Sequence, residues 1–175
     1  MRIFRILSVA VLVAGLVGAA GSAHHLVTGA RLQAQANPAN TTADFTAFLD
    51  TVDAAQRELQ NGRPEAFKAL WARADDVTLS GGFGGAIEKG WDAVSRRLDW
   101  VGTQFSNGTN RVQRIVSNVS GDLGYVVQTE HLRYRVPGQA NDSTRDYRVT
   151  MICRREAGAW RMIHRHADSQ TVKQQ

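Results

Sequence analysis

The spacing of apolar residues changes from a helical period in the first half of the chain to strict alternation in the second half. Residues 42–61 carry an apolar stripe at helical spacing, which stops at Asn61-Gly62. Pro64 is suited to open a second, short helix, and residues 90–105 carry a third stripe. The three stripes consist of Phe45, Phe48, Leu49, Val52, Ala55 and Leu59, then Phe67, Leu70 and Trp71, then Trp91, Val94, Leu98, Val101 and Phe105.

Alternation of apolar and polar residues predicts the strands. The predicted strands cover 111–119, 124–136, 147–155 and 158–168, with an earlier one over 75–83. The earlier strand runs into the glycine-rich segment 81–85, which lacks the Lys-Ser/Thr of a phosphate loop and the spacing of a dinucleotide loop. That segment therefore predicts a bend where the chain passes closely over another element. Helices grouped before a run of four strands predict an α+β fold with an antiparallel sheet.

The strand over 158–168 is the most informative part of the chain. Strict alternation places four side chains on one of its faces, namely Trp160, Met162, His164 and His166. Arg161 and Arg165 lie on the other face. Two histidines that share a face with an aromatic ring are typical of a pocket wall. We therefore predict that this face lines a ligand pocket.

The turn before this strand decides which residues of the preceding strand join the pocket. A three-residue turn with Gly158 at positive φ would pair Thr150 with His164. The same register would pair Arg148 with His166 and add Ile152 to the apolar floor of the pocket. A two-residue Ala157-Gly158 turn is the alternative, and it would place the histidines beside Met151 and Val149.

Three of these side chains are candidates for catalysis, namely His164, His166 and Arg148. Imidazoles titrate near neutral pH, as an acid or a base requires. A His-x-His pair could bind a metal only with a third ligand, so we assign no metal site and no cofactor. An inward Arg148 would need a carboxylate partner or an anionic ligand. Either Glu130 or His131 faces the pocket, because alternation makes the two exclusive.

The N-terminal residues have the order of a secretory signal. Arg2 and Arg5 precede an uncharged, apolar run over 6–20, and small residues follow. We predict a signal peptide over 1–23, with cleavage possible as late as residue 36, and a polar linker over 24–41. The mature protein is then periplasmic or secreted. An uncleaved segment would instead anchor the chain to the membrane.

Charge and cysteine content narrow the class of protein. The net charge is +5, but from residue 37 onwards 18 basic residues face 16 acidic ones, which leaves +2. The arginines are scattered through strands rather than clustered with aromatic residues, so we do not expect nucleic-acid binding. Cys153 is the only cysteine, so no internal disulfide can form, and we expect it to be a buried apolar residue.

Several motifs resemble the nuclear transport factor 2-like superfamily, and within it the SnoaL-like branch. They are the segments 71–79, with Trp71 four residues before Asp75-Asp76, 90–94, with Gly90-Trp91, 122–127, 148–150, and 160–168, the closing strand. The resemblance covers about residues 42–168, so we assign the domain to 42–170 and a tail to 171–175. It implies a cone, in which the helices and a curved antiparallel sheet enclose a central cavity.

The resemblance includes ketosteroid isomerase-like proteins and the association domain of a calmodulin-dependent kinase. In an ungapped match through Asp75-Asp76, the isomerase's basic aspartate falls on Gly81, and residues 42–61 contain no tyrosine to polarise a carbonyl. Steroid isomerisation is therefore disfavoured. The kinase domain has an arginine at the position of Thr150, and the match with it favours an inward His131.

Three functions remain open on the sequence alone. The first is a pocket that binds a small acidic or amphipathic molecule. The second is an enzyme of the cyclase, dehydratase or hydrolase class that uses the histidines and Arg148. The third is an oligomerisation module. We also expect a homodimer, because one face of the strand over 147–155 is entirely apolar and needs a cover; that face consists of Tyr147, Val149, Met151 and Cys153.

Overall fold

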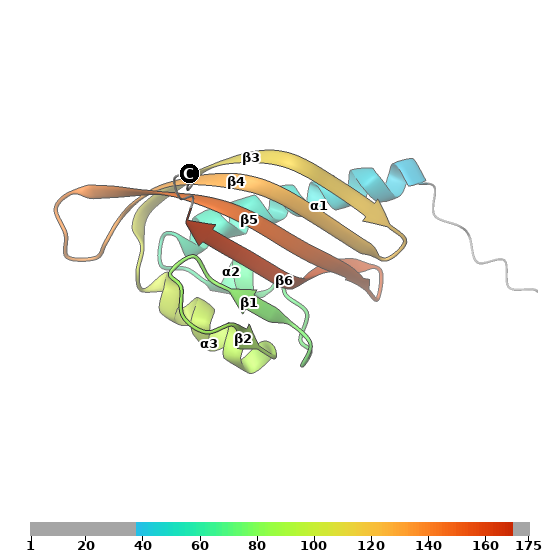
Figure 1. Ribbon diagram of the computed structural model, residues 1–175, viewed down its shortest axis with the longest axis horizontal. Helices are drawn as coiled ribbons and strands as arrows, with labels where there is room; N and C mark the ends of the chain where they lie inside the picture. Colours follow the sequence, from blue (N-terminus) through green and yellow to red (C-terminus); the bar gives the residue numbers. More distant parts are fainter. Residues whose placement is uncertain (1–37, 170–175) are drawn as a thin grey trace, which may run out of the picture. The chain divides into compact units, whose positions relative to one another are not determined.

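The structure is a computed structural model, and it describes residues 38–169, which belong to one compact unit. Its elements are α1 (Pro38–Leu59), α2 (Glu65–Lys68), β1 (Thr78–Ser80), β2 (Glu88–Lys89), α3 (Trp91–Gly102), β3 (Ser106–Ser120), β4 (Leu123–Arg135), β5 (Asp142–Glu156) and β6 (Ala159–Ser169) (Figure 1). Their order confirms the predicted α+β class. The predicted signal peptide, the tail and linker residues 24–37 lie outside the described residues. The last four residues of the expected linker, 38–41, are helical.

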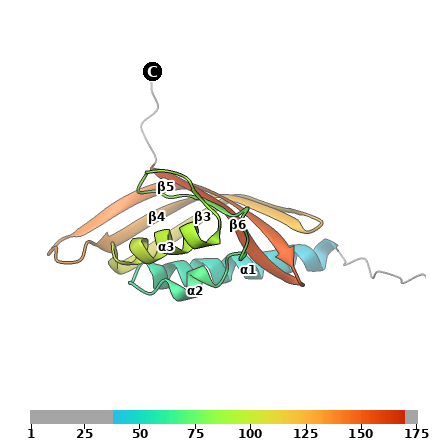
Figure 2. The ribbon, with the colours of Figure 1, turned by 90° about the horizontal axis from the view of Figure 1, so that it is seen from below.

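The six strands form one open, mixed sheet in the order β2-β1-β6-β5-β4-β3. β3 to β6 form the predicted antiparallel meander. β1 differs, because it pairs with β6 in parallel, with Thr78 opposite His164. This is possible because a long connection, rather than a hairpin, separates the two strands. All three helices lie on one side of the curved sheet (Figure 2).

The apolar stripe of α1 packs on the inner face of the sheet, as predicted. Phe45, Leu49 and Val52 are at most 2% exposed, and burying each such side chain contributes roughly 1.5–3 kcal/mol. The helix approaches β4 closely at Gly124, where a Cβ atom would lie 2.8 Å from the Phe45 ring. Gly124 therefore sets how near α1 can lie to the sheet. No helix among residues 38–169 is both long and apolar enough to span a membrane.

The apolar face of β5 is the inner face. Val149, Met151 and Cys153 are at most 1% exposed and Tyr147 is 5% exposed, all beneath the helices. We predicted that a second subunit covers this face, and that reasoning is wrong, because the helices of the same chain cover it. Burial also raises the pKa of the Cys153 thiol to about 12, so this cysteine is a packing residue, as expected.

The hairpin between β5 and β6 has the two-residue turn, and the predicted three-residue turn is wrong. Glu156 pairs with Ala159, and Ala157 and Gly158 both have positive φ, as a tight hairpin turn of this length requires. The register then shifts by one residue at a bulge: Cys153 pairs with Met162, but Ile152 pairs with His164. Every side chain of β6 after Ile163 consequently points to the face opposite to the one that strict alternation predicts.

Candidate functional site

The bulge at Ile163 divides the predicted pocket wall between the two faces of the sheet. Trp160 and Met162 are buried on the inner face, whereas His164 and His166 lie on the outer face beside Ile152 and Thr150. The predicted grouping of all four β6 side chains on one face is therefore wrong. Arg165, which alternation placed on the other face from them, is 7% exposed and points inward.

The outer-face candidates are bound to neighbours on that face. Arg148 donates from Nε and Nη2 to the two carboxylate oxygens of Asp168, at 3.1 and 2.6 Å. His164 Nδ1 lies 2.8 Å from the hydroxyl of Thr78. Partial burial, with a smaller effect of His166, lowers the pKa of His164 below its ordinary value.

The alternative left open on β4 is decided in favour of Glu130. Glu130 is fully buried on the inner face, while His131 lies on the outer face, with Nδ1 2.6 Å from Asp146 Oδ1. The expected inward orientation of His131 is therefore wrong. Trp160 lies at the other end of the sheet, with its ring centroid 4.9 Å from that of Phe45.

A cavity lies on the inner face, between the sheet and helices α1 and α3. Its volume is about 60 Å³, which gives room for roughly five water-sized spheres and is small beside pockets for drug-sized ligands. None of the eight predicted pocket residues lines it. The residues that line it are Gln56, Leu59, Gln60, Phe67, Leu79, Gly81, Gly82, Phe83, Leu98, Val101, Phe105, Leu132, Tyr147, Arg165 and Ala167.

A buried ion pair contributes its arginine, Arg165, to the polar part of the cavity wall. Arg165 donates from Nη1 and Nη2 to the two oxygens of Glu130, at 3.1 and 2.8 Å. Gln56 and Gln128 donate their amide N–H groups to the same carboxylate, at 2.6 and 2.7 Å. Burial alone would raise the pKa of Glu130, but the charge of Arg165 and these hydrogen bonds outweigh it, so the pKa lies below its ordinary value.

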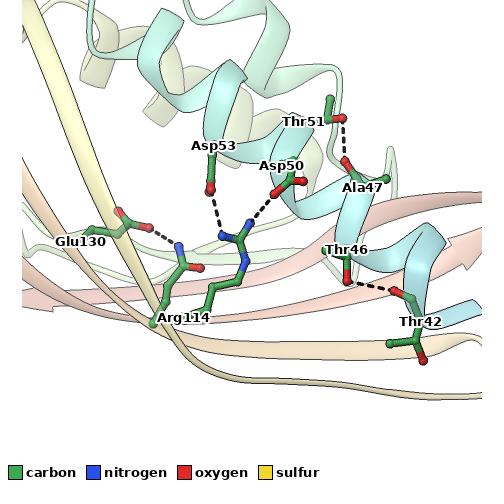
Figure 3. A network of polar contacts seen from close by, with 9 residues as sticks. Thr42, Thr46, Ala47, Asp50, Thr51, Asp53, Arg114 and Glu130 are labelled. Carbon is green, nitrogen blue, oxygen red and sulfur yellow. Dashed lines mark hydrogen bonds and ion pairs between the residues drawn. The ribbon is translucent and has the colours of Figure 1, made fainter.

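A second ion pair connects α1 to β3 beside the first. Arg114 donates to Asp53 at 3.0 Å and lies 3.5 Å from Asp50, and Figure 3 shows these groups together, with Glu130 close by. Burial raises the pKa of Asp53, and Arg114 only partly offsets it. The buried pair Glu130–Arg165 and the half-buried pair Asp53–Arg114 each combine one positive and one negative charge. The polar wall is therefore electrically neutral.

Two amide oxygens at the cavity wall lack a protein partner. Gln56 and Gln60 are at most 4% exposed, and Oε1 of each has no hydrogen-bond partner among residues 38–169. The orientation of Gln56 is fixed by chemistry, because only its N–H group can donate to the Glu130 carboxylate. Its oxygen therefore remains as an acceptor at the wall.

The segment 81–85, which we call the glycine loop, forms one side of the cavity. A Cβ atom at Gly82 would overlap the ring of Tyr147, which confirms the predicted bend over another element. The Phe83 ring lies 5.3 Å from the rings of Trp100 and Phe105. The cavity is thus bordered by aromatic rings where it meets the glycine loop.

The sequence reasoning missed two residues of the polar wall, Arg165 and Gln56. Arg165 was placed on the wrong face because a β-bulge leaves no mark in the alternation of residue types. Gln56 was detectable, because it follows Val52 by four residues and Leu49 by seven, on the buried stripe of α1.

Within residues 38–169 no group of three or more His, Cys, Asp or Glu side chains could hold a metal ion.

Comparisons with known proteins agree with this architecture. Residues 48–171 match the model of the SnoaL-like domain family. Comparison with curated protein sequences finds no significant match. A candidate dehydratase of the NTF2-like family from Streptomyces avermitilis has a similar structure, with a TM-score of 0.67, 17% identity, and coverage of 78% of this chain and 100% of that one.

Two further solved structures are similar. A candidate calcium/calmodulin-dependent protein kinase type II association domain from Thiobacillus denitrificans has a TM-score of 0.59 and 23% identity, over 72% of this chain and 94% of that one. A ketosteroid isomerase-like protein from Erwinia carotovora atroseptica has a TM-score of 0.59 and 16% identity, over 79% and 99%. At these identities the likeness concerns the fold alone. The family match covers most of the chain, and the chain therefore belongs to the family of SnoaL-like domains.

Proposed function

We propose that the chain binds a small amphipathic molecule in the inner cavity. The observation that carries the proposal is the composition of the cavity wall, in which an apolar surface surrounds a few polar groups. Leu79, Leu98 and Leu132 contribute to the apolar part, and Gln56 and Arg165 to the polar part. A few polar groups in a mostly apolar concave site are typical of small-molecule sites.

The ionisable groups of the wall support binding rather than acid–base catalysis. Burial raises the pKa of Tyr147 above its ordinary value of 10, so its hydroxyl keeps its proton at neutral pH and can donate a hydrogen bond. The guanidinium of Arg165 is a cation that already binds Glu130. The enzyme hypothesis assigned proton transfer to His164 and His166, which lie on the opposite face of the sheet.

Filling the cavity tests this proposal. Ala167 lines the cavity, so Ala167→Leu would occupy part of its volume, whereas Thr144→Leu adds the same kind of group at an exposed position of β5. Native mass spectrometry of the protein from its own host should show a bound small molecule in the wild type and in Thr144→Leu, and its loss in Ala167→Leu. Equal retention of the molecule by the folded Ala167→Leu variant would contradict the proposal.

We further propose that the outer face of the sheet binds a second copy of the chain. Large apolar side chains on β3, β4 and β5 are 37–61% exposed there, and they comprise Ile115, Val116, Leu123, Tyr125 and Ile152. Tyr125 and Ile152 are direct partners in the sheet. The ion pairs Arg148–Asp168 and His131–Asp146 lie on the same face, so the surface carries both charge signs and can complement itself across a two-fold axis.

Sedimentation analysis tests this second proposal. Ile152→Asp should convert a dimer into a monomer at micromolar concentration, because a charge would be buried at the centre of the patch. Ile87→Asp is the matched control, since Ile87 is 66% exposed outside the strands. A wild-type protein that sediments as a monomer at this concentration would refute the proposal.

A further inference from the structure

Two arginines from different elements hold the glycine loop at the edge of the cavity. Arg97 of α3 donates from Nη2 to the carbonyl oxygen of Gly84 at 2.7 Å. The guanidinium of Arg145, on β5, lies 4.6 Å from the centroid of the Phe83 ring. Phe83 lines the cavity, and so does Gly81, where a Cβ atom would lie 3.7 Å from Nε of Arg97. Both cations therefore stand next to residues of the cavity wall.

Neither of these arginines forms an ion pair within residues 38–169. Arg145 instead donates from Nε to the Tyr134 hydroxyl at 2.9 Å and, over a longer 3.4 Å, from Nη1 to the Tyr147 hydroxyl. These two contacts and the Phe83 ring orient the guanidinium. A guanidinium has five N–H donors, so most of those of Arg145 remain available to a ligand.

The polar wall and the glycine loop thus differ in net charge. In the polar wall, Glu130 neutralises Arg165, and beside this pair Asp53 neutralises Arg114. A carboxylate placed there would lose its hydration and meet the negative charge of Glu130. The positive charges of Arg97 and Arg145 have no such counter-ion in the part of the chain that the structure describes, where both donate to uncharged oxygens. Binding of an anionic group is consequently favoured at the glycine loop and disfavoured at the polar wall.

We propose that the ligand is a small amphipathic carboxylate, bound with its apolar end in the cavity and its carboxylate at the glycine loop against Arg145 and Arg97. This inference rests on the proposed function of the cavity. The planar guanidinium matches the geometry of a carboxylate, and hydrogen bonds to charged groups are stronger than neutral ones. Tyr147 lines the cavity, and its hydroxyl also contacts Arg145. It is therefore placed where the apolar part of the ligand would meet the carboxylate.

A pair of isosteric probes tests the inference. Propionate and propionamide have nearly the same shape, and their ethyl group suits a cavity of about 60 Å³, but only propionate carries a negative charge. We would titrate each into the full-length protein, follow the Nε–H signals of the arginines by NMR, and derive the dissociation constants. Propionate should bind about tenfold more tightly than propionamide, in keeping with a partly desolvated charged hydrogen bond. The signals of Arg145 and Arg97 should shift, and the preference should decrease at high salt.

Variants separate this inference from the proposed function. Arg145→Gln should reduce the preference for propionate over propionamide to within about twofold, because the neutral amide of glutamine cannot form a charged hydrogen bond with the carboxylate. Arg161→Gln is the matched control, because Arg161 also lacks an acidic partner in the described structure but contacts the carbonyl of Ala69, which does not line the cavity. It should retain the full preference.

The possible results are distinct. Equal binding of propionate and propionamide would overturn the carboxylate inference and leave the binding proposal standing. A propionate preference that survives Arg145→Gln and Arg97→Gln would also overturn it. Binding of neither probe to a folded wild-type protein would count against the proposed function of the cavity as well.

Discussion

The inner and outer faces of β5 alternate along one strand but differ in what surrounds them. Tyr147, Val149 and Met151 are buried beneath the helices, and the nearby charges of Glu130 and Arg165 are paired out of contact with water. Arg148 and Ile152 lie on the outer face, where the ion pair of Arg148 is solvated. The same type of interaction, an arginine with a carboxylate, therefore has a different energetic role on each face. On the inner face, loss of one partner leaves the other charge buried without a partner. On the outer face, water solvates the charge that remains.

The largest effect should come from breaking the inner ion pair. Glu130→Ala leaves Arg165 buried without its partner, so we expect a loss of about 3–5 kcal/mol in the free energy of unfolding, measured by urea denaturation. Asp168→Ala breaks the outer pair with Arg148 and should change the free energy of unfolding very little. A double replacement, Glu130→Met with Arg165→Met, should recover much of the loss. Equal effects of the inner and outer single variants would refute the contrast between the faces.

The glycine loop should show the next largest effect. Gly82→Ala would push a methyl group into the ring of Tyr147, and overpacking of this kind costs about 1–3 kcal/mol. Gly81→Ala is its matched control, because the added group would meet only Arg97 at an ordinary contact distance of 3.7 Å. Thermal denaturation of both variants checks the prediction. Comparable melting temperatures for the two would mean that the loop does not lie against Tyr147.

The pH dependence of stability should show a smaller effect. The pKa of Glu130 in the folded protein is lower than its ordinary value. Glu130 therefore contributes stability that is fully present above its unfolded-state pKa, near 4.5, and is lost as the pH falls through the folded-state pKa. Glu130→Gln should flatten this acid limb in denaturation series between neutral pH and pH 3. An acid limb that is as steep in the variant as in the wild type would contradict this assignment.

Much of the fold could be predicted from the sequence, because local patterns determine it. The stripe from Phe45 to Leu59 identified α1, and alternation identified β3 to β6. The site could not be predicted in the same way. One extra residue at Ile163 reverses the orientation of every later side chain of β6, and alternation carries no sign of it. Arg97 and Arg145 lie 48 positions apart in the sequence, and only the three-dimensional fold brings both to the glycine loop.

The most direct test of the central claim asks which face of the sheet responds to a ligand. Methyl groups report on both faces: Ala167 and Leu132 line the inner cavity, whereas Thr150 and Ile152 lie on the outer face. In a methyl NMR titration with propionate, the signals of Ala167 and Leu132 should shift in a saturable manner, and those of Thr150 and Ile152 should stay in place. Saturable shifts confined to Thr150 and Ile152 would place the ligand on the outer face and contradict the account.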